Sequence, residues 1–99
     1  MKLGIDATSI SRFEGVSSSF ASRFCHIDEI NQLQNQPNSA EYLAGIWAIK
    51  EAMFKADNSM SNFSNICLKR TQNHWKYDGW LISITHEKDM LIAVVIKEE

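Results

Sequence analysis

This sequence of 99 residues has no run of lysines and arginines, no long apolar stretch and only two cysteines. A formal charge of −2, together with the missing basic run, argues against nucleic acid or an anionic membrane as the main partner. No apolar segment reaches the length of a signal peptide near the N-terminus, and none later reaches the length of a membrane span. We therefore expect a cytoplasmic protein.

The scarcity of cysteine excludes a disulfide framework. Without a secretory signal, Cys25 and Cys67 are expected to be buried or reduced thiols. Cys25 is adjacent to His26, and Cys67 lies seven positions before His74, so neither spacing matches a C-x2-C pair of metal ligands. We expect no zinc site built on the cysteines.

The composition is that of an ordinary globular protein, with 44% hydrophobic and 22% charged residues. A chain of this size is long enough for one core and too short for two, so residues 1–99 are expected to form a single domain. No internal repeat, low-complexity tract or linker divides the sequence.

Short elements are predicted on both sides of one long helix. A strand at residues 3–5 ends near Asp6, and two short helices follow at 20–24 and 27–33, the first with an N-cap from the serines at 17–19. The long helix begins at Asn38 or Ser39, where Glu41 completes a capping box with Asn38, and it runs to about Ala56.

The second half of the sequence predicts an antiparallel meander after a polar loop at 57–65. Its strands are expected at residues 66–70, 75–77, 80–84 and 91–96, with Asp78-Gly79 as a two-residue hairpin turn. The predicted class is α+β, an antiparallel sheet packed on a long central helix.

The long helix carries more apolar residues than one packing face requires, which implies two buried contacts; they are Tyr42, Leu43, Ile46, Trp47, Ile49, Met53 and Phe54. A narrower strip of small residues would let another backbone or a ligand come close, and it ends in two charges; its members are Ala44, Ala48, Glu51, Ala52 and Lys55.

Glu51 and Lys55 lie four positions apart on one helix face, while Lys50 points roughly 100° away from Glu51. The two can act on one ligand together, although the spacing alone favours an ordinary helix-stabilising ion pair. Asp6, at a strand end, is a candidate for a metal or phosphate site or for a turn residue. Two carboxylates and a lysine suit a diphosphate with Mg²⁺, because Mg²⁺ is often held by one or two carboxylates and the lysine neutralises phosphoryl charge.

Several segments of the chain, in this order, match one known family: residues 4–6, residues 20–24 with Glu29, residues 41–45 leading into 47–56, and residues 83–87 followed by 93–96. The most specific of them is the string Trp-Ala-x-Lys-Glu-Ala-x-x-Lys-Ala at 47–56. In these segments the sequence resembles the 4′-phosphopantetheinyl transferases of the holo-acyl-carrier-protein synthase type.

The resemblance implies that Asp6 and Glu51 bind Mg²⁺ on the diphosphate of coenzyme A and that Lys55 contacts the same phosphates. A serine hydroxyl of an acyl carrier protein would attack the β-phosphate and release 3′,5′-ADP. The catalytic residues would be Glu51 and Lys55, with Glu51 acting as the base directly or through a metal-bound water.

The resemblance also implies that Lys50, Thr85 and His86 lie by coenzyme A, with His86 near the 3′-phosphate. The alternative for His86 is a strand-end histidine satisfied by a backbone group. Arg12 and Arg23 would meet the acidic helix of the carrier protein, although both also fit a purely structural surface role. The implied assembly is a homotrimer with active sites between subunits.

Three departures from the family pattern keep other functions open. Ser9 and Ile46 stand where the family has a glutamate and a phosphate-binding arginine, and residues 57–61 replace a glycine-rich turn. A lost phosphate contact of this kind costs about 1.5–3 kcal/mol. The chain is thus a compact, divergent transferase, or a degenerate homologue that binds a carrier protein or coenzyme A without transfer. In a third interpretation the helix is only an oligomerisation element with a surface ion pair.

Overall fold

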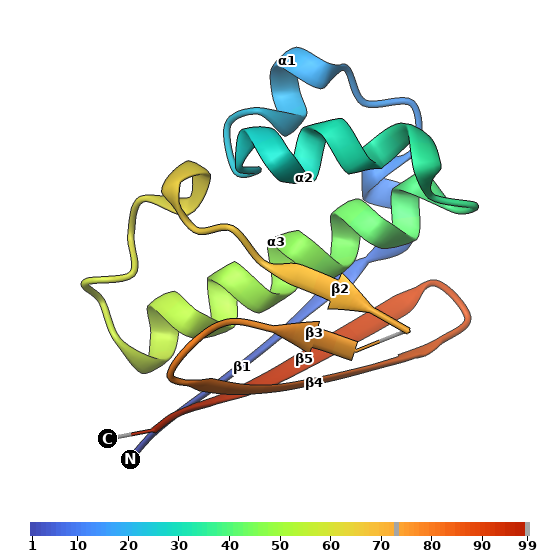
Figure 1. Ribbon diagram of the computed structural model, residues 1–99. Coiled ribbons are helices and arrows are strands. Elements are labelled where there is room, and N and C mark those ends of the chain that lie inside the picture. Colours follow the sequence, from blue (N-terminus) through green and yellow to red (C-terminus); the bar gives the residue numbers. More distant parts are fainter. Residues whose placement is uncertain (73, 99) are drawn as a thin grey trace.

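The computed structural model describes residues 1–72 and 74–98, and they are arranged in three layers (Figure 1). The middle layer is the helix α3 (Ser39–Ala56). On one side of it lie the short helices α1 (Ser18–Ala21) and α2 (Ile27–Gln32). On the other side lies an antiparallel sheet in the order β1-β5-β4, formed by β1 (Lys2–Ser9), β4 (Trp80–Glu87) and β5 (Met90–Lys97).

The remaining elements connect these layers. The strands β2 (Lys69–Thr71) and β3 (His74–Lys76) form a separate two-stranded ribbon. Short 3-10 segments lie at Ile10–Phe13, Leu33–Asn35 and Phe63–Asn65. None of the helices among the described residues combines the length and the apolar character that a membrane crossing requires.

Local signals in the sequence predict the capping residues of α1 and α3, although the first short helix, expected at 20–24, spans Ser18–Ala21. The Asn38 side chain accepts a hydrogen bond from the Glu41 N–H at 3.0 Å, so α3 begins where its capping residue predicts. The Ser17 hydroxyl caps α1 by accepting from the Phe20 N–H, also at 3.0 Å. At α2 a histidine, His26, occupies the N-cap position and forms a reciprocal capping box with Glu29.

Strand pairing differs from the predicted meander. The first and last strands pair along their whole length, from Lys2 opposite Lys97 to Ser9 opposite Met90. The turn at Asp78-Gly79 is present, with a bridge between Tyr77 and Trp80 and a φ of +85° at Gly79. It leads from the β2-β3 ribbon into the main sheet instead of joining neighbours within one sheet.

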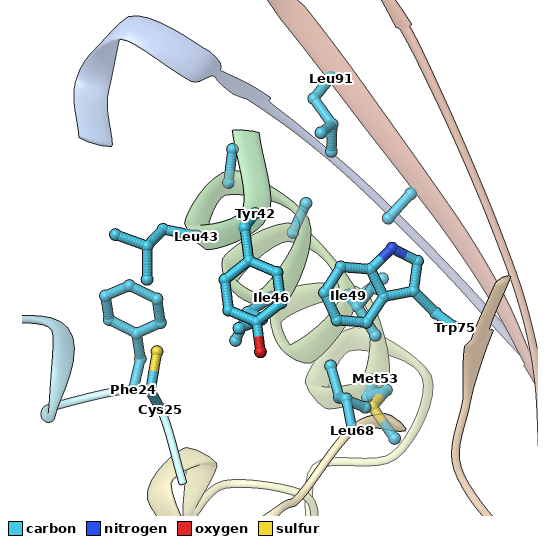
Figure 2. Packing of buried hydrophobic residues seen from close by; sticks show 14 of the residues in the cluster. Phe24, Cys25, Tyr42, Leu43, Ile46, Ile49, Met53, Leu68, Trp75 and Leu91 are labelled. Atoms are coloured by element: carbon cyan, nitrogen blue, oxygen red, sulfur yellow. The ribbon is translucent and has the colours of Figure 1, made fainter. Parts of the chain in front are cut away.

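Both predicted buried contacts of α3 are formed inside this chain. On the face toward α1 and α2, large side chains fill the core, and Figure 2 shows Leu43 and Ile46 packed with Phe24 and Tyr42. On the face toward the sheet, the small residues Ala44, Ala48 and Ala52 are fully buried. Most of the wide apolar arc of the helix is therefore buried within the monomer, while Trp47 is half-buried and Phe54 is 37% exposed.

Gly4 sets how closely β1 approaches the helix. A Cβ atom at this position would lie 1.9 Å from the backbone oxygen of Ala52, so only glycine fits without moving the backbone. The small strip of the helix thus admits another backbone, as expected, and this backbone is β1.

The outer face of the sheet, turned away from α3, exposes large apolar side chains. Leu3 and Ile5 of β1 and Leu81 of β4 are 66%, 58% and 55% exposed. Ile96 and Val94 of β5 lie between these strands in the pairing register and are half-buried. This patch of Leu3, Ile5, Leu81, Val94 and Ile96, here called the outer sheet face, is an apolar surface that the fold leaves partly exposed.

Candidate active site

Asp6 and Lys55 meet where β1 crosses the C-terminal half of α3. Side chains alternate along a strand, so Asp6 points to the same side as Gly4, toward the helix. The Lys55 Nζ donates to Asp6 Oδ1 at 2.9 Å and to the Ile5 carbonyl oxygen at 3.1 Å. Asp6 lies within an eight-residue strand and not at its end, so the alternative role as a turn residue is wrong.

Glu51 lies one helical turn before Lys55 on α3 and is half-buried. No described side chain forms an ion pair or hydrogen bond with its carboxylate, and Lys55 pairs with Asp6 instead. The ordinary surface pair between Glu51 and Lys55, which their spacing alone favours, is therefore not formed. A half-buried carboxylate without a protein partner is suited to hold a cation or to accept a proton.

The donor set of Asp6 and Glu51 fits Mg²⁺. Both offer carboxylate oxygens, and Mg²⁺ commonly takes one or two of them and completes its shell with water and phosphate oxygens. The Asp6 side chain is 14% exposed and the Lys55 side chain 52% exposed, so the pair lies at the surface, where a phosphate group has access.

Lys50 lies elsewhere, which corrects the expectation that it binds coenzyme A. Its side chain is completely buried, and its ammonium group donates to Glu29 Oε1 at 2.6 Å and to the carbonyl oxygens of Phe24 and Phe63 at 2.8 and 2.9 Å. Burial lowers the pKa of Lys50, and the Glu29 carboxylate opposes this shift. Because three protein acceptors surround the ammonium group, Lys50 has a structural role.

Glu29, the ion-pair partner of Lys50, accepts two further hydrogen bonds from the backbone. Its Oε1 also accepts from the His26 N–H, and its Oε2 accepts from the Leu68 N–H, each at 2.7 Å. The pair of Glu29 and Lys50 therefore fastens the start of α2 and the segment before β2 to the turn of α3 that precedes Glu51.

His86 lies at the other end of α3. Its Nε2 is 2.9 Å from Glu41 Oε1, in the first turn of the helix, so a side chain and not a backbone group is its partner. Both residues line a cavity of about 360 Å³ together with Pro37, Asn38, Arg70 and Ile84. Thr85 is exposed on the opposite face of β4 from His86, so it does not share this cavity.

Arg70 was missed by the sequence reasoning, although it brings a fixed positive charge to the cavity of His86. Its guanidinium lies 5.2 Å from the centre of the Trp75 ring, which holds it in a stacked position. Ile46, by contrast, is fully buried among the core side chains shown in Figure 2. The cation at this end of the helix therefore comes from β2 and not from position 46.

The other two departures from the family pattern also have structural explanations. Ser9 is three positions after Asp6 on the same strand, so it points to the opposite sheet face and is not a neighbour of the Asp6 carboxylate within this chain. The turn after α3 is built by Asp57, which accepts hydrogen bonds from the backbone and hydroxyl of Ser59 and pairs with Lys97. These bonds, that of Lys97 first, hold the pKa of Asp57 well below its usual range.

Arg12 and Arg23 are both exposed, and Arg12 contacts an aromatic cluster. The Arg12 guanidinium lies 4.8 Å from the centre of the Trp47 ring, and Trp47 packs edge-on against Phe24 at 5.3 Å. Arg23 is the residue before Phe24, just after α1. The stacking gives Arg12 a structural contact, and it also fixes a positive charge at this surface.

Comparisons of the sequence and of the fold with known proteins all point to one family. The model of the 4′-phosphopantetheinyl transferase superfamily matches residues 2–95. A holo-[acyl-carrier-protein] synthase of Mycoplasma mobile is 43% identical over 98 residues, which cover 98% of this chain and 89% of that protein. Two solved structures share the fold at lower sequence identity.

The first is the holo-[acyl-carrier-protein] synthase of Neisseria meningitidis, with a TM-score of 0.82 and 23% identity over 99% of this chain and 98% of that one. The second is a holo-(acyl-carrier-protein) synthase of Bacillus anthracis in complex with CoA (3′,5′-ADP), with a TM-score of 0.80 and 24% identity over 99% and 96% of the two chains. The α+β fold with its antiparallel sheet is thereby confirmed.

Proposed function

Since this chain belongs to the 4′-phosphopantetheinyl transferase superfamily, we propose that it transfers the 4′-phosphopantetheine group of coenzyme A to a serine of an apo acyl carrier protein. The observation that carries this proposal is the contact between Asp6 and Lys55 beside Glu51, whose carboxylate has no partner among the described residues. The name of the Mycoplasma mobile relative, a holo-[acyl-carrier-protein] synthase, supports the same reaction.

In this reaction the serine oxygen attacks the β-phosphorus of coenzyme A. A bond forms between the serine oxygen and that phosphorus, and the bond to the bridging oxygen breaks, so 3′,5′-ADP leaves with the bridging oxygen. Glu51 takes the serine proton, directly or through a water molecule. Lys55 stabilises the negative charge that builds on the phosphoryl oxygens.

Asp6 and Glu51 would hold Mg²⁺, which, when bound, neutralises part of the diphosphate charge. The Lys55 Nζ already lies 2.9 Å from Asp6 Oδ1, so its ammonium group is beside the carboxylate that would hold the ion. Asp6 therefore orients Lys55 as well as contributing a ligand.

We place the active site between neighbouring subunits of a homotrimer. Glu41, the partner of His86, and Lys55, the partner of Asp6, are 14 positions apart on α3, which corresponds to about 21 Å along the helix axis. The diphosphate and the 3′-phosphate of coenzyme A are attached to the same ribose and cannot span that length. The outer sheet face supplies an apolar surface on which further copies could assemble.

In this arrangement one subunit holds the diphosphate with Asp6, Glu51 and Lys55. A neighbouring subunit presents the cavity of Arg70 and His86 to the 3′-phosphate. Arg70 then takes over the role of the arginine that position 46 lacks, because a guanidinium binds phosphate through paired hydrogen bonds.

Mixing two inactive variants tests this shared site. Subunits with Glu51→Gln keep Arg70, and subunits with Arg70→Gln keep Glu51, so each is expected to be poorly active alone at low coenzyme A concentration. After co-refolding at equal amounts, about a quarter of the sites in a trimer combine the two intact halves, and activity returns to about a quarter of the normal value. Activity in the mixture that never exceeds the average of the two variants would show that one chain supplies both halves.

The carrier protein is proposed to dock at the surface of Arg12 and Arg23. Arg12, which is fixed over the Trp47 ring, and the exposed Arg23 next to Phe24 supply two positive charges that complement an acidic helix. Replacing Arg23 with Ala should then raise KM for the carrier while leaving KM for coenzyme A unchanged, as initial-rate measurements would show.

The transfer itself is tested by incubating the protein with Mg²⁺, coenzyme A and several apo carrier proteins. Both cysteines are free, in keeping with the reducing cytoplasm in which we place the reaction, so the assay includes a reductant. Mass spectrometry is expected to show one carrier gaining a phosphopantetheine group, with 3′,5′-ADP appearing in equal amount. If coenzyme A and Mg²⁺ raise the melting temperature but no carrier gains mass, the protein is a binding homologue and not a transferase.

A further inference from the structure

Three side chains of different chemistry meet beside the start of α2, in a group that shares no residue with the proposed active site. The His26 Nδ1 is 3.8 Å from Asp28 Oδ2, and the Cys67 Sγ is 3.9 Å from the same oxygen. One ligand atom from each residue lies within 4.8 Å of the others. The group thus brings one nitrogen, one oxygen and one sulfur close together.

The fold, and not sequence spacing, brings these residues together, which is why the spacing of the cysteines and histidines led us to expect no zinc site. Asp28 and Cys67 are 39 positions apart, and the segment that carries Cys67 is held against α2 by the bond from the Leu68 N–H to Glu29. Asp28 and Cys67 also line a cavity of about 480 Å³ that opens to solvent, so an ion has access to the group. Its position is fixed by the buried pair of Glu29 and Lys50 directly beneath it.

We propose that His26, Asp28 and Cys67 form a binding site for a zinc-class divalent ion, with a fourth position left to water. Ligand atoms in a tetrahedral zinc site lie about 3.3–3.6 Å apart, given zinc bond lengths of about 2.0–2.3 Å. The separations of 3.8 and 3.9 Å exceed this range by a few tenths of an ångström. The third, between the His26 nitrogen and the Cys67 sulfur, lies within 4.8 Å, so these side chains draw together when the ion binds. A thiolate, an imidazole and a carboxylate favour zinc over Mg²⁺, which prefers oxygen ligands alone.

Binding exchanges two weak hydrogen bonds for metal bonds. The Cys67 thiol now donates to Asp28 Oδ2, and it must release its proton to solvent to become a ligand. The lone pair of His26 Nδ1 now accepts the Asp28 N–H at 3.0 Å, and this lone pair is the one that the ion would take. Because a proton is released, binding strengthens as the pH rises. The bound ion would cross-link the start of α2, which carries His26 and Asp28, to the segment before β2, which carries Cys67.

Cobalt and zinc serve as the two probes. With Co²⁺ under reducing conditions, the protein is expected to show thiolate-to-cobalt charge-transfer absorption in the near ultraviolet and the visible bands of tetrahedral Co²⁺. With excess Zn²⁺, the melting temperature should rise by at least about 4 °C. Mg²⁺ at the same concentration should produce neither the bands nor a comparable rise.

Matched variants locate the site. His26→Asn keeps an N-cap acceptor for α2 but removes the imidazole, so it should fold normally and lose the zinc-dependent rise. Cys67→Ala should lose both the rise and the charge-transfer band. Cys25→Ala should keep both, because Cys25 is buried and burial raises its pKa to about 12.

Glu51→Gln should also keep the cobalt bands, which separates this site from the proposed Mg²⁺ site. The proposal is overturned if the unaltered protein shows no thiolate-to-cobalt band. It is equally overturned if His26→Asn and Cys67→Ala keep the full zinc-dependent rise in melting temperature.

Discussion

Replacing Glu51 with Gln is expected to lower kcat for phosphopantetheine transfer by a factor of about 10²–10⁴ while leaving the melting temperature almost unchanged. Gln has the same shape but neither accepts the serine proton nor offers a charged ligand to Mg²⁺, and a positioned general base contributes a factor of this size. The fold should tolerate the change because no described side chain bonds to Glu51, which is only half-buried.

The measurement is a steady-state rate with carrier protein and coenzyme A, accompanied by thermal unfolding of the same sample. Glu98→Gln is a matched control, because Glu98 is exposed near the end of the chain and its backbone, not its side chain, bonds to Gly79. A Glu51→Gln protein that retains full kcat would remove Glu51 from the mechanism.

Replacing Lys50 with Met should destabilise the protein by about 3–5 kcal/mol, because the Glu29 carboxylate would remain buried without its counter-charge. For a chain of this size the melting temperature would fall by more than about 12 °C. The Glu29 side chain is 1% exposed, so water cannot compensate for the lost ammonium group. Chemical denaturation monitored by circular dichroism would measure the change.

The double variant Glu29→Gln with Lys50→Met is the control for this prediction. It removes the uncompensated charge, so it should be more stable than Lys50→Met alone, and a double-mutant cycle would give the coupling between the two residues. KM for coenzyme A in the folded fraction of Lys50→Met should be unchanged, since the ammonium group does not face solvent. A Lys50→Met protein that is fully stable but binds coenzyme A weakly would restore the ligand role first expected from the sequence.

The two lysines of the central helix show what the sequence could reveal. Lys50 follows Ile46 and Trp47 at helical spacing, so it belongs to the apolar arc, and its burial was open to prediction from that pattern. The identity of its partner, Glu29, was not open to prediction, because no local pattern relates two residues that are 21 positions apart. Lys55, by contrast, is half-exposed and contacts Asp6, and the contact with phosphate that the resemblance implies stays a prediction.

Contacts between distant segments account for the other differences. The pairing of β1 with β5 joins the two ends of the sequence, and alternation within each strand does not specify a partner. Arg70 lies in β2 and Cys67 lies just before it, and the bond from the Leu68 N–H to Glu29 holds this segment against α2. By contrast, the helix caps at Ser17 and Asn38 rest on residues three positions apart and were predicted correctly.

The pairing of β1 with β5 has a consequence for synthesis on the ribosome. Asp6, Glu51 and Lys55 are all translated within the first 55 positions, yet β1 gains its only neighbour within the described sheet when residues 90–97 emerge. A nascent chain that ends before them holds every proposed catalytic side chain but has no partner strand to keep Asp6 in register. Because closing a loop between such distant segments is slow, this pairing, and with it the catalytic centre, is expected to form late in folding.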